Sequence, residues 1–357
     1  MRPGSIAELQ NLVPNYPHLR LRGGGSKSAL APGAGGEGVI EMGGLAGILE
    51  YQPQEFTFTA LAGTPLELIE NKLAENGQYL PFDPPLVGSG ATLGGTIAAG
   101  MSGAGRYRYG GLRDFLLGVA FVDAQARLVR GGGKVVKNAA GFDLPKLMVG
   151  SLGQYGALVE VCFKVFPRTA SYATLRTHYV TLAEALENLV RLSLTPLEIY
   201  ALELLPESSG YSLLVRLGGA EGTLVERLDR LREMLGRGQA LDGADEHQLW
   251  QAESEFSWVP AGYRLVKVPV TPRQVPALDA LLDQRSALRH YSVGANLAWI
   301  AWSGVLAELD QALLRLGLSG LVILGEADAP RLGVRTDNSL ERRVKQALDP
   351  QNRWGEV

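Results

Sequence analysis

The sequence is poor in the side chains that build metal and redox centres. It has one cysteine, Cys162, and four histidines, His18, His178, His247 and His290. One thiol cannot form an internal disulfide, a CxxC motif or the ligand set of an iron–sulfur cluster. The histidines are too far apart for local spacing to indicate a metal site. We expect no metal in this chain.

Long apolar runs and charge of one sign are also missing. No run is long enough to span a bilayer, and the first residues, MRPGSIAELQNLV, lack the apolar core of a signal peptide. The net charge is −3, and no basic stripe marks a nucleic-acid surface. We expect a cytoplasmic protein that binds no nucleic acid and meets a membrane only through partners.

Glycine is abundant, with 45 residues, and the first glycine-rich loop is RGGGSK at 22–27. Three consecutive glycines let successive amide groups converge on one oxygen-rich group. Ser26 adds a hydroxyl, and Arg22 or Lys27 adds positive charge. The spacing does not fit G-x-G-x-x-G, so the loop is not a Rossmann fingerprint. It is typical of an anion-binding loop.

A second glycine loop, GATLGG at 90–95, leads into a run of small residues. We interpret it as the start of a short helix whose amide groups and dipole face an anion. GGGK at 131–134 is no P-loop, because Val135 stands where Ser or Thr is required. Two anion loops in one domain favour a diphosphate held between them.

The composition changes near Arg168, where glycine becomes rarer and strands alternate regularly with helices. At 357 residues, two domains are expected. Thr64 and Thr181 each begin a capping box and predict helix starts. Two β-α-β-β-type units predict an antiparallel sheet with helices on one face. We place the domains at 1–168 and 169–330, with a C-terminal helix and tail, 331–357, returning toward the first domain.

Several motifs together resemble a known family: RGGGSK at 22–27, GATLGG at 90–95, MSG at 101–103, LRDFLLG at 112–118 and KNAAGFDLPKLMVGS at 137–151. They are similar to the FAD-binding fold of the vanillyl-alcohol-oxidase or PCMH type, and most similar to FAD-binding subunits of bacterial glycolate oxidases. The resemblance covers about 3–167 and continues more weakly. It implies an α+β fold: a PCMH-type FAD-binding domain of two α+β subdomains, followed by an antiparallel-sheet cap with ferredoxin-like units.

The resemblance implies FAD as the cofactor. Covalent relatives place a histidine where this chain has Ser26 or Lys27, which indicates non-covalent binding. The residues implied to hold or line FAD are Arg22, Gly23, Gly24, Gly25, Ser26, Lys27, Gly90, Ala91, Thr92, Gly94, Gly95, Ser102, Gly103, Asp114, Gly141, Gly153, Gly156 and Val159.

Catalytic residues are harder to assign. Oxidation of a 2-hydroxy acid needs a base for the hydroxyl proton and a clamp for the carboxylate. Related dehydrogenases carry a His-x-His metal cluster in the cap, which this chain lacks. Arg106 and Arg108 are candidate clamps, with solvated loop arginines as an equal alternative, and His290 is the candidate base.

We therefore expect an FAD-dependent oxidoreductase subunit of a glycolate-oxidase-like complex that oxidises a small 2-hydroxy acid, glycolate to glyoxylate. The resemblance implies a larger FAD-containing catalytic subunit and an iron–sulfur subunit as partners, with electrons relayed between them. Two alternatives stay open: a scaffold subunit with a vestigial flavin site, and a stand-alone flavin oxidoreductase on another hydroxy acid or alcohol.

Overall fold

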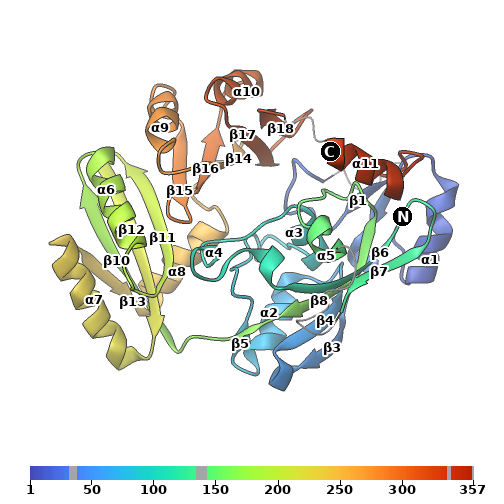
Figure 1. Ribbon diagram of the computed structural model, residues 1–357, viewed down its shortest axis with the longest axis horizontal. Helices are drawn as coiled ribbons and strands as arrows, with labels where there is room; N and C mark the ends of the chain where they lie inside the picture. The colour runs from blue at the N-terminus through green and yellow to red at the C-terminus, as the bar shows by residue number, and fades with distance from the viewer. Residues whose placement is uncertain (32–37, 134–142, 336–338, 356–357) are drawn as a thin grey trace. The chain divides into compact units, whose positions relative to one another are not determined.

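The computed structural model describes residues 1–31, 38–133, 143–335 and 339–355 (Figure 1). The chain divides into two compact units. Unit 1 comprises Met1–Ser102, Gly110–Arg168 and Thr336–Val357. Unit 2 comprises Gly103–Tyr109 and Thr169–Arg335.

Unit 1 is built on a five-stranded antiparallel sheet with the strand order β3-β4-β8-β6-β7. A separate parallel pair, β1 and β2, leads into the first glycine loop. The elements of unit 1 are α1 (Ile6–Leu12), η1 (Val13–Asn15), β1 (Arg20–Arg22), β2 (Val39–Glu41), η2 (Met42–Gly44), β3 (Ile48–Gln52), η3 (Pro53–Glu55), β4 (Thr57–Leu61), α2 (Leu66–Ala74), β5 (Gln78–Tyr79), α3 (Leu93–Ala98), η4 (Leu112–Asp114), β6 (Leu116–Val122), β7 (Leu128–Gly132), α5 (Leu144–Met148), β8 (Ala157–Lys164), β9 (Phe166–Pro167) and α11 (Ser339–Leu348).

The core of unit 1 joins residues from both ends of the chain. Leu9, Leu19, Val159 and Trp354 all have fully buried side chains in one apolar cluster. Burying such an aliphatic side chain contributes about 1.5–3 kcal/mol. Cys162 lies on β8 as a buried thiol, as the apolar run around it predicts.

Unit 2 contains a nine-stranded sheet with the order β13-β10-β12-β11-β15-β16-β14-β17-β18, in which every neighbouring pair is antiparallel. This confirms the predicted antiparallel sheet. Its elements are α4 (Arg106–Tyr109), β10 (Ser171–Tyr179), α6 (Leu182–Ser193), β11 (Ile199–Glu207), β12 (Gly210–Gly219), α7 (Glu221–Leu235), β13 (Gln239–Asp242), α8 (Gly243–Ser254), β14 (Arg264–Pro269), α9 (Val275–Asp283), β15 (Leu288–Ser292), β16 (Leu297–Trp302), α10 (Leu306–Arg315), β17 (Ser319–Leu324) and β18 (Arg331–Gly333).

The middle of this sheet is covered on both faces. All six residues of β16, LAWIAW, are buried, and a continuous apolar run is what a strand between two covered faces requires. Helices α6 and α7 pack against β10 and β12, as their places in Figure 1 illustrate. No helix in the described parts of the chain combines the length and apolar character needed to cross a membrane.

The two predicted capping boxes have different outcomes. Thr181 caps α6, because its side chain accepts a hydrogen bond from Glu184 N at 3.3 Å. The prediction for Thr64 is wrong: α2 begins at Leu66 without a side-chain cap. The Thr64 hydroxyl instead donates to Leu61 O at 2.6 Å and accepts from Gly47 N at 2.8 Å.

Candidate functional site

The two glycine loops of unit 1 lie against each other. A Cβ on Gly24 would stand 1.8 Å from Gly90 O, and one on Gly23 would stand 2.4 Å from Thr92 Oγ1. Backbone this close at Gly24, and the Thr92 hydroxyl this close at Gly23, leave room only for glycine at the two positions as the loops stand. Strand β1 brings the first loop to this point, and the turn before α3 brings the second. Two loops about 70 residues apart in the sequence are thus in contact in the folded chain.

The two loops differ in which amide groups are engaged. In the first loop, no hydrogen bond among the described residues uses the N–H groups of Gly23, Gly24, Gly25 or Ser26. In the second loop, Gly94 N donates to Ala62 O at 2.7 Å. Gly95 N donates to the N-cap Thr92 at 3.3 Å. The expectation that both loops present amide groups to an anion therefore fits the first loop better than the second, whose amides fix α3 in place.

Lys27 carries the positive charge at this site. Its side chain is 6 % exposed, and its Nζ donates to Ser26 Oγ at 3.3 Å and to Thr96 Oγ1 at 3.4 Å. Within the described residues no carboxylate lies within ion-pair distance of it. Burial lowers the pKa of Lys27 to about 8. A buried ammonium group without a counter-charge is costly, and a bound anion would relieve that cost.

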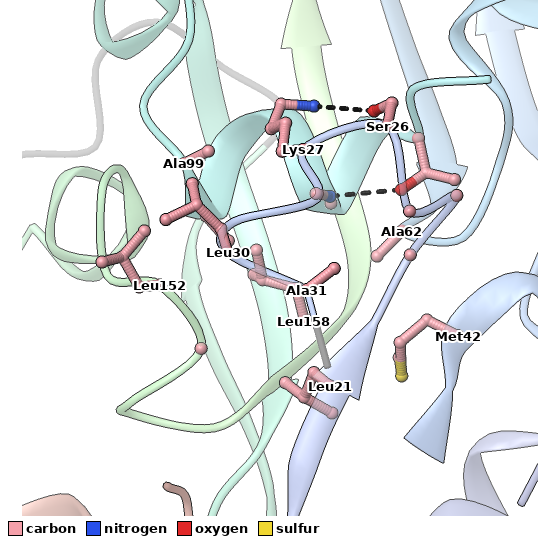
Figure 2. A pocket seen from close by; sticks show the side chains of 18 of the residues that line it. Leu21, Ser26, Lys27, Leu30, Ala31, Met42, Ala62, Ala99, Leu152 and Leu158 are labelled. Atoms are coloured by element: carbon pink, nitrogen blue, oxygen red, sulfur yellow. Dashed lines mark hydrogen bonds between the residues drawn. The ribbon is translucent and has the colours of Figure 1, made fainter. Parts of the chain in front are cut away.

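A pocket opens beside these loops (Figure 2). Its walls are the loop 23–27, the start of α3 and the segment 151–158. Figure 2 shows Ser26 and Lys27 at one end and the apolar side chains of Leu21 and Met42 at the other. Ser151, in the third wall, has a buried Oγ without a hydrogen-bond partner in the described structure. A cavity with a cationic, amide-rich end and an apolar end suits a dinucleotide.

Ten of the residues predicted from the sequence line this pocket. They are Gly23, Gly24, Gly25, Ser26, Lys27, Thr92, Gly94, Gly95, Gly153 and Gly156. Arg22, Gly90 and Ala91 flank the two loops without lining the pocket. Val159 is fully buried in the core, and its neighbour Leu158 faces the pocket instead.

Other predicted residues serve local structure or lie elsewhere. Ser102 Oγ accepts from Leu112 N at 3.0 Å, and an oxygen of the Asp114 carboxylate accepts from Gly111 N at 2.8 Å. Gly103 belongs to unit 2. Gly141 lies outside the described residues.

Sequence reasoning missed several pocket residues. Leu21, Met42, Ala62, Ser151 and Leu158 all line the cavity. The apolar residues gave no separate signal, because alternating strands require apolar side chains whether or not they line a pocket. Ser151 could have been found, since it ends the motif 137–151, two residues before the predicted Gly153.

The three candidate catalytic side chains all lie in unit 2. Arg108 forms an ion pair with Glu198 at 2.8 Å, which lowers the pKa of that carboxyl group. His290 Nδ1 lies 2.8 Å from Glu253 Oε2, and its ring stacks on Trp258 with centroids 3.9 Å apart. Both side chains are therefore held by neighbours within their own unit.

Arg106 is exposed on α4 and lies near Lys267 of β14. The pKa of Lys267 is lowered to about 8, mainly by burial and also by the charge of Arg106. Among the described residues, no three His, Cys, Asp or Glu side chains come together as a metal site would require.

Comparison with known proteins defines the class of protein. The FAD binding domain family model matches residues 1–132. The solved structure of an alkyldihydroxyacetonephosphate synthase covers 100% of this chain with a TM-score of 0.70, and this chain covers 77% of that one. At 16% identity this likeness shows the fold alone. The protein is an FAD-dependent oxidoreductase with a PCMH-type FAD-binding domain and an antiparallel-sheet cap, which confirms the predicted fold class and cofactor.

The nearer relatives define the family. Glycolate oxidase subunit GlcE of Escherichia coli is 34% identical over 288 residues, 80% of this chain and 78% of the relative. A D-2-hydroxyglutarate dehydrogenase of Xanthomonas citri is 33% identical over 168 residues, 46% of this chain and 35% of that enzyme. Glycolate oxidase subunit GlcD of Bacillus subtilis is 28% identical over 211 residues, 54% of this chain and 44% of that subunit. The chain belongs to the family of FAD-binding glycolate oxidase subunits represented by GlcE.

Proposed function

We propose that this chain is the FAD-binding subunit of a glycolate-oxidase-like complex that oxidises a 2-hydroxy acid, glycolate to glyoxylate, and relays the electrons to partner subunits. The observation that carries the proposal is Lys27, a buried ammonium group that has no carboxylate partner among the described residues and lies beside glycine amides that no described residue engages. The similarity to glycolate oxidase subunits GlcE and GlcD supports glycolate as the substrate class.

Each wall of the pocket has a role in holding the cofactor. The amide groups of Gly23, Gly24 and Gly25 and the ammonium group of Lys27 would bind the diphosphate, because charge-assisted hydrogen bonds to oxyanions are the strongest available here. The small residues at Gly153 and Gly156 leave room for the adenosine end. FAD supplies two-electron redox chemistry when it is bound.

Non-covalent binding is part of the proposal. Histidine, cysteine and tyrosine are the side chains able to make a flavin linkage, and none of them lines the described pocket. The family resemblance implies that covalent relatives carry their histidine where this chain has Ser26 or Lys27. FAD should therefore leave the protein when it is denatured, and its release is measurable in the supernatant.

Partner subunits complete the proposed reaction. Arg108 and His290 are engaged within unit 2, and one cysteine cannot ligate an iron–sulfur cluster. We propose that a larger FAD-containing subunit oxidises the substrate and that an iron–sulfur subunit passes the electrons on.

Reconstitution tests this function. The purified chain should be yellow, with bound FAD that glycolate leaves oxidised until the partner subunits are added; absorbance near the flavin maximum follows both states. Bleaching by glycolate without partners would instead indicate a stand-alone oxidoreductase. A colourless protein that still assembles with its partners would indicate a scaffold.

A further inference from the structure

The C-terminal segment of unit 1, residues 339–355, contains a buried lysine that does not line the pocket. Lys345, on α11, is 9 % exposed. Its Nζ donates to Gln154 O at 2.9 Å, to Asp349 Oδ2 at 2.7 Å and to Trp354 O. An ammonium group has three protons to donate, so all three are used. Such a fully satisfied buried cation fixes the groups around it.

One of these acceptors belongs to the pocket wall. Gln154 lies between Gly153 and Gly156, which line the pocket. The wall has an unusual backbone: Leu152 has φ 53 and Gly153 has φ 82. A left-handed conformation at a non-glycine residue is unfavourable and persists only when surrounding contacts hold it. The hydrogen bond from Lys345 is one such contact, and Leu152 N donating to Ala98 O at 2.8 Å is another.

The same C-terminal segment also holds the strand that leads to the first glycine loop. Trp354 is fully buried in the unit 1 core. Leu19 N donates to Arg353 O at 2.7 Å, and Gly355 N donates to Leu19 O at 2.9 Å. Strand β1 begins at the next residue and ends where the loop 23–27 starts. The C-terminal segment thus contacts Gln154 in one wall of the pocket and Leu19, which precedes the strand leading to another wall.

Asp349 accepts hydrogen bonds from three other residues of this segment. Its carboxylate is 2 % exposed and accepts from Lys345 Nζ, from Trp354 N at 2.7 Å and from Arg353 N at 2.8 Å. A buried carboxylate with three donors, one of them a lysine, is fully compensated. Loss of either charged partner would leave the other buried and unpaired, and the segment would detach from Gln154.

We propose that Lys345, held by Asp349, is a positioning residue for FAD: it fixes the left-handed backbone at residues 152–153 of the pocket wall 151–158, so FAD retention depends on the C-terminal segment. The inference rests on the proposed cofactor residues. It predicts that an alteration of the C-terminal segment, at a residue outside the pocket lining, weakens FAD binding.

The test compares Lys345→Met with two controls in the full chain. Arg343→Met removes an exposed cation from the same helix. Leu9→Ala destabilises the core cluster that also contains Trp354, but it removes none of the hydrogen bonds of Lys345 and Asp349. FAD dissociation constants come from flavin fluorescence titration at a temperature where all variants are folded, and hydrogen exchange reports on 150–156.

We expect Lys345→Met to raise the FAD dissociation constant roughly tenfold and to speed exchange in 150–156. Of the three hydrogen bonds that this change removes, one charge-assisted bond is to the pocket wall, at Gln154 O. Leu9→Ala should lower the melting temperature but leave the constant within about twofold of the unaltered chain. An unchanged constant in Lys345→Met would overturn the inference. If Lys345→Met does not fold, Asp349→Asn takes its place, and an unchanged FAD dissociation constant in Asp349→Asn would overturn the inference. Failure of the unaltered chain to bind FAD would overturn the proposed cofactor site itself, and this inference with it.

Discussion

Gly24→Ala is the sharpest test of the site, because one methyl group would separate the two glycine loops. The added Cβ would lie 1.8 Å from Gly90 O and 3.0 Å from Gly90 C. An ordinary carbon–oxygen contact is about 3.3 Å or more, so the loops must part by more than about 1 Å. The obstacle is backbone, which cannot rotate aside as a flexible side chain can.

The size of the effect follows from the contacts that this shift removes. Hydrogen bonds from amide groups to a charged oxygen contribute about 1.5–3 kcal/mol each. Displacing two of the amides of Gly23, Gly24 and Gly25 would cost about 3–6 kcal/mol, which corresponds to a loss of FAD affinity of about 10²–10⁴-fold.

The assay is FAD titration of the apoprotein followed by flavin fluorescence, with circular dichroism to verify the fold. Gly90→Ala is the matched control in the facing loop. Nothing lies within 4 Å of a Cβ there, and the cost is that of a left-handed alanine at φ +81, about 1 kcal/mol. Gly90→Ala should lose less than about tenfold in affinity. FAD binding by folded Gly24→Ala within threefold of the unaltered chain would refute the reasoning.

Three further predictions concern single side chains. Burial lowers the pKa of Lys27 to about 8, so the affinity for anionic FAD should fall as the pH rises from 7 to 9.5. Titrations of Lys27→Met should show no such pH dependence of FAD affinity. A pH dependence that persists in this variant would contradict the role of Lys27. Without FAD the folded chain binds fewer protons at Lys27 than the unfolded chain between about pH 8 and 10.5, so stability should rise with pH there. Burial raises the pKa of Glu203 to about 8, so the free energy of unfolding should fall between pH 4.5 and 8 by up to about 1.4 kcal/mol per pH unit. In Glu203→Gln the melting temperature should depend less on pH over this range. An equal pH dependence in the two proteins would contradict this prediction. Thr181→Ala should cost about 1 kcal/mol in denaturant unfolding by removing the cap of α6, and an unchanged midpoint would count against the cap.

Much of the site was predictable because its features are local in the sequence. Three consecutive glycines before Ser26 and the glycines around Thr92 are typical of loops with close backbone approach or left-handed conformations, and the structure places these loops in contact at Gly24 and Gly90. The cap at Thr181 was predictable for the same reason, since donor and acceptor are three residues apart.

What could not be predicted depends on distant partners. The Thr64 hydroxyl is taken by Gly47, 17 residues away, and so does not cap α2. The Tyr109 hydroxyl donates to that of Tyr200 at 2.7 Å across 91 residues, a contact within unit 2 that no local pattern signals. The burial of Lys27 likewise depends on Thr96 and the start of α3, which approach it only in the folded chain.

The position of Trp354 has a consequence for the order of events during synthesis. Its ring fills the same core as Leu9 and Leu19, which leave the ribosome more than 300 residues earlier. The core of unit 1 therefore lacks one of its side chains until Trp354 has been translated, whereas the strands of unit 2 are available to pair before that point. Flavin loading should accordingly follow the synthesis of Trp354, and nascent chains stalled before residue 354 should emerge without the cofactor.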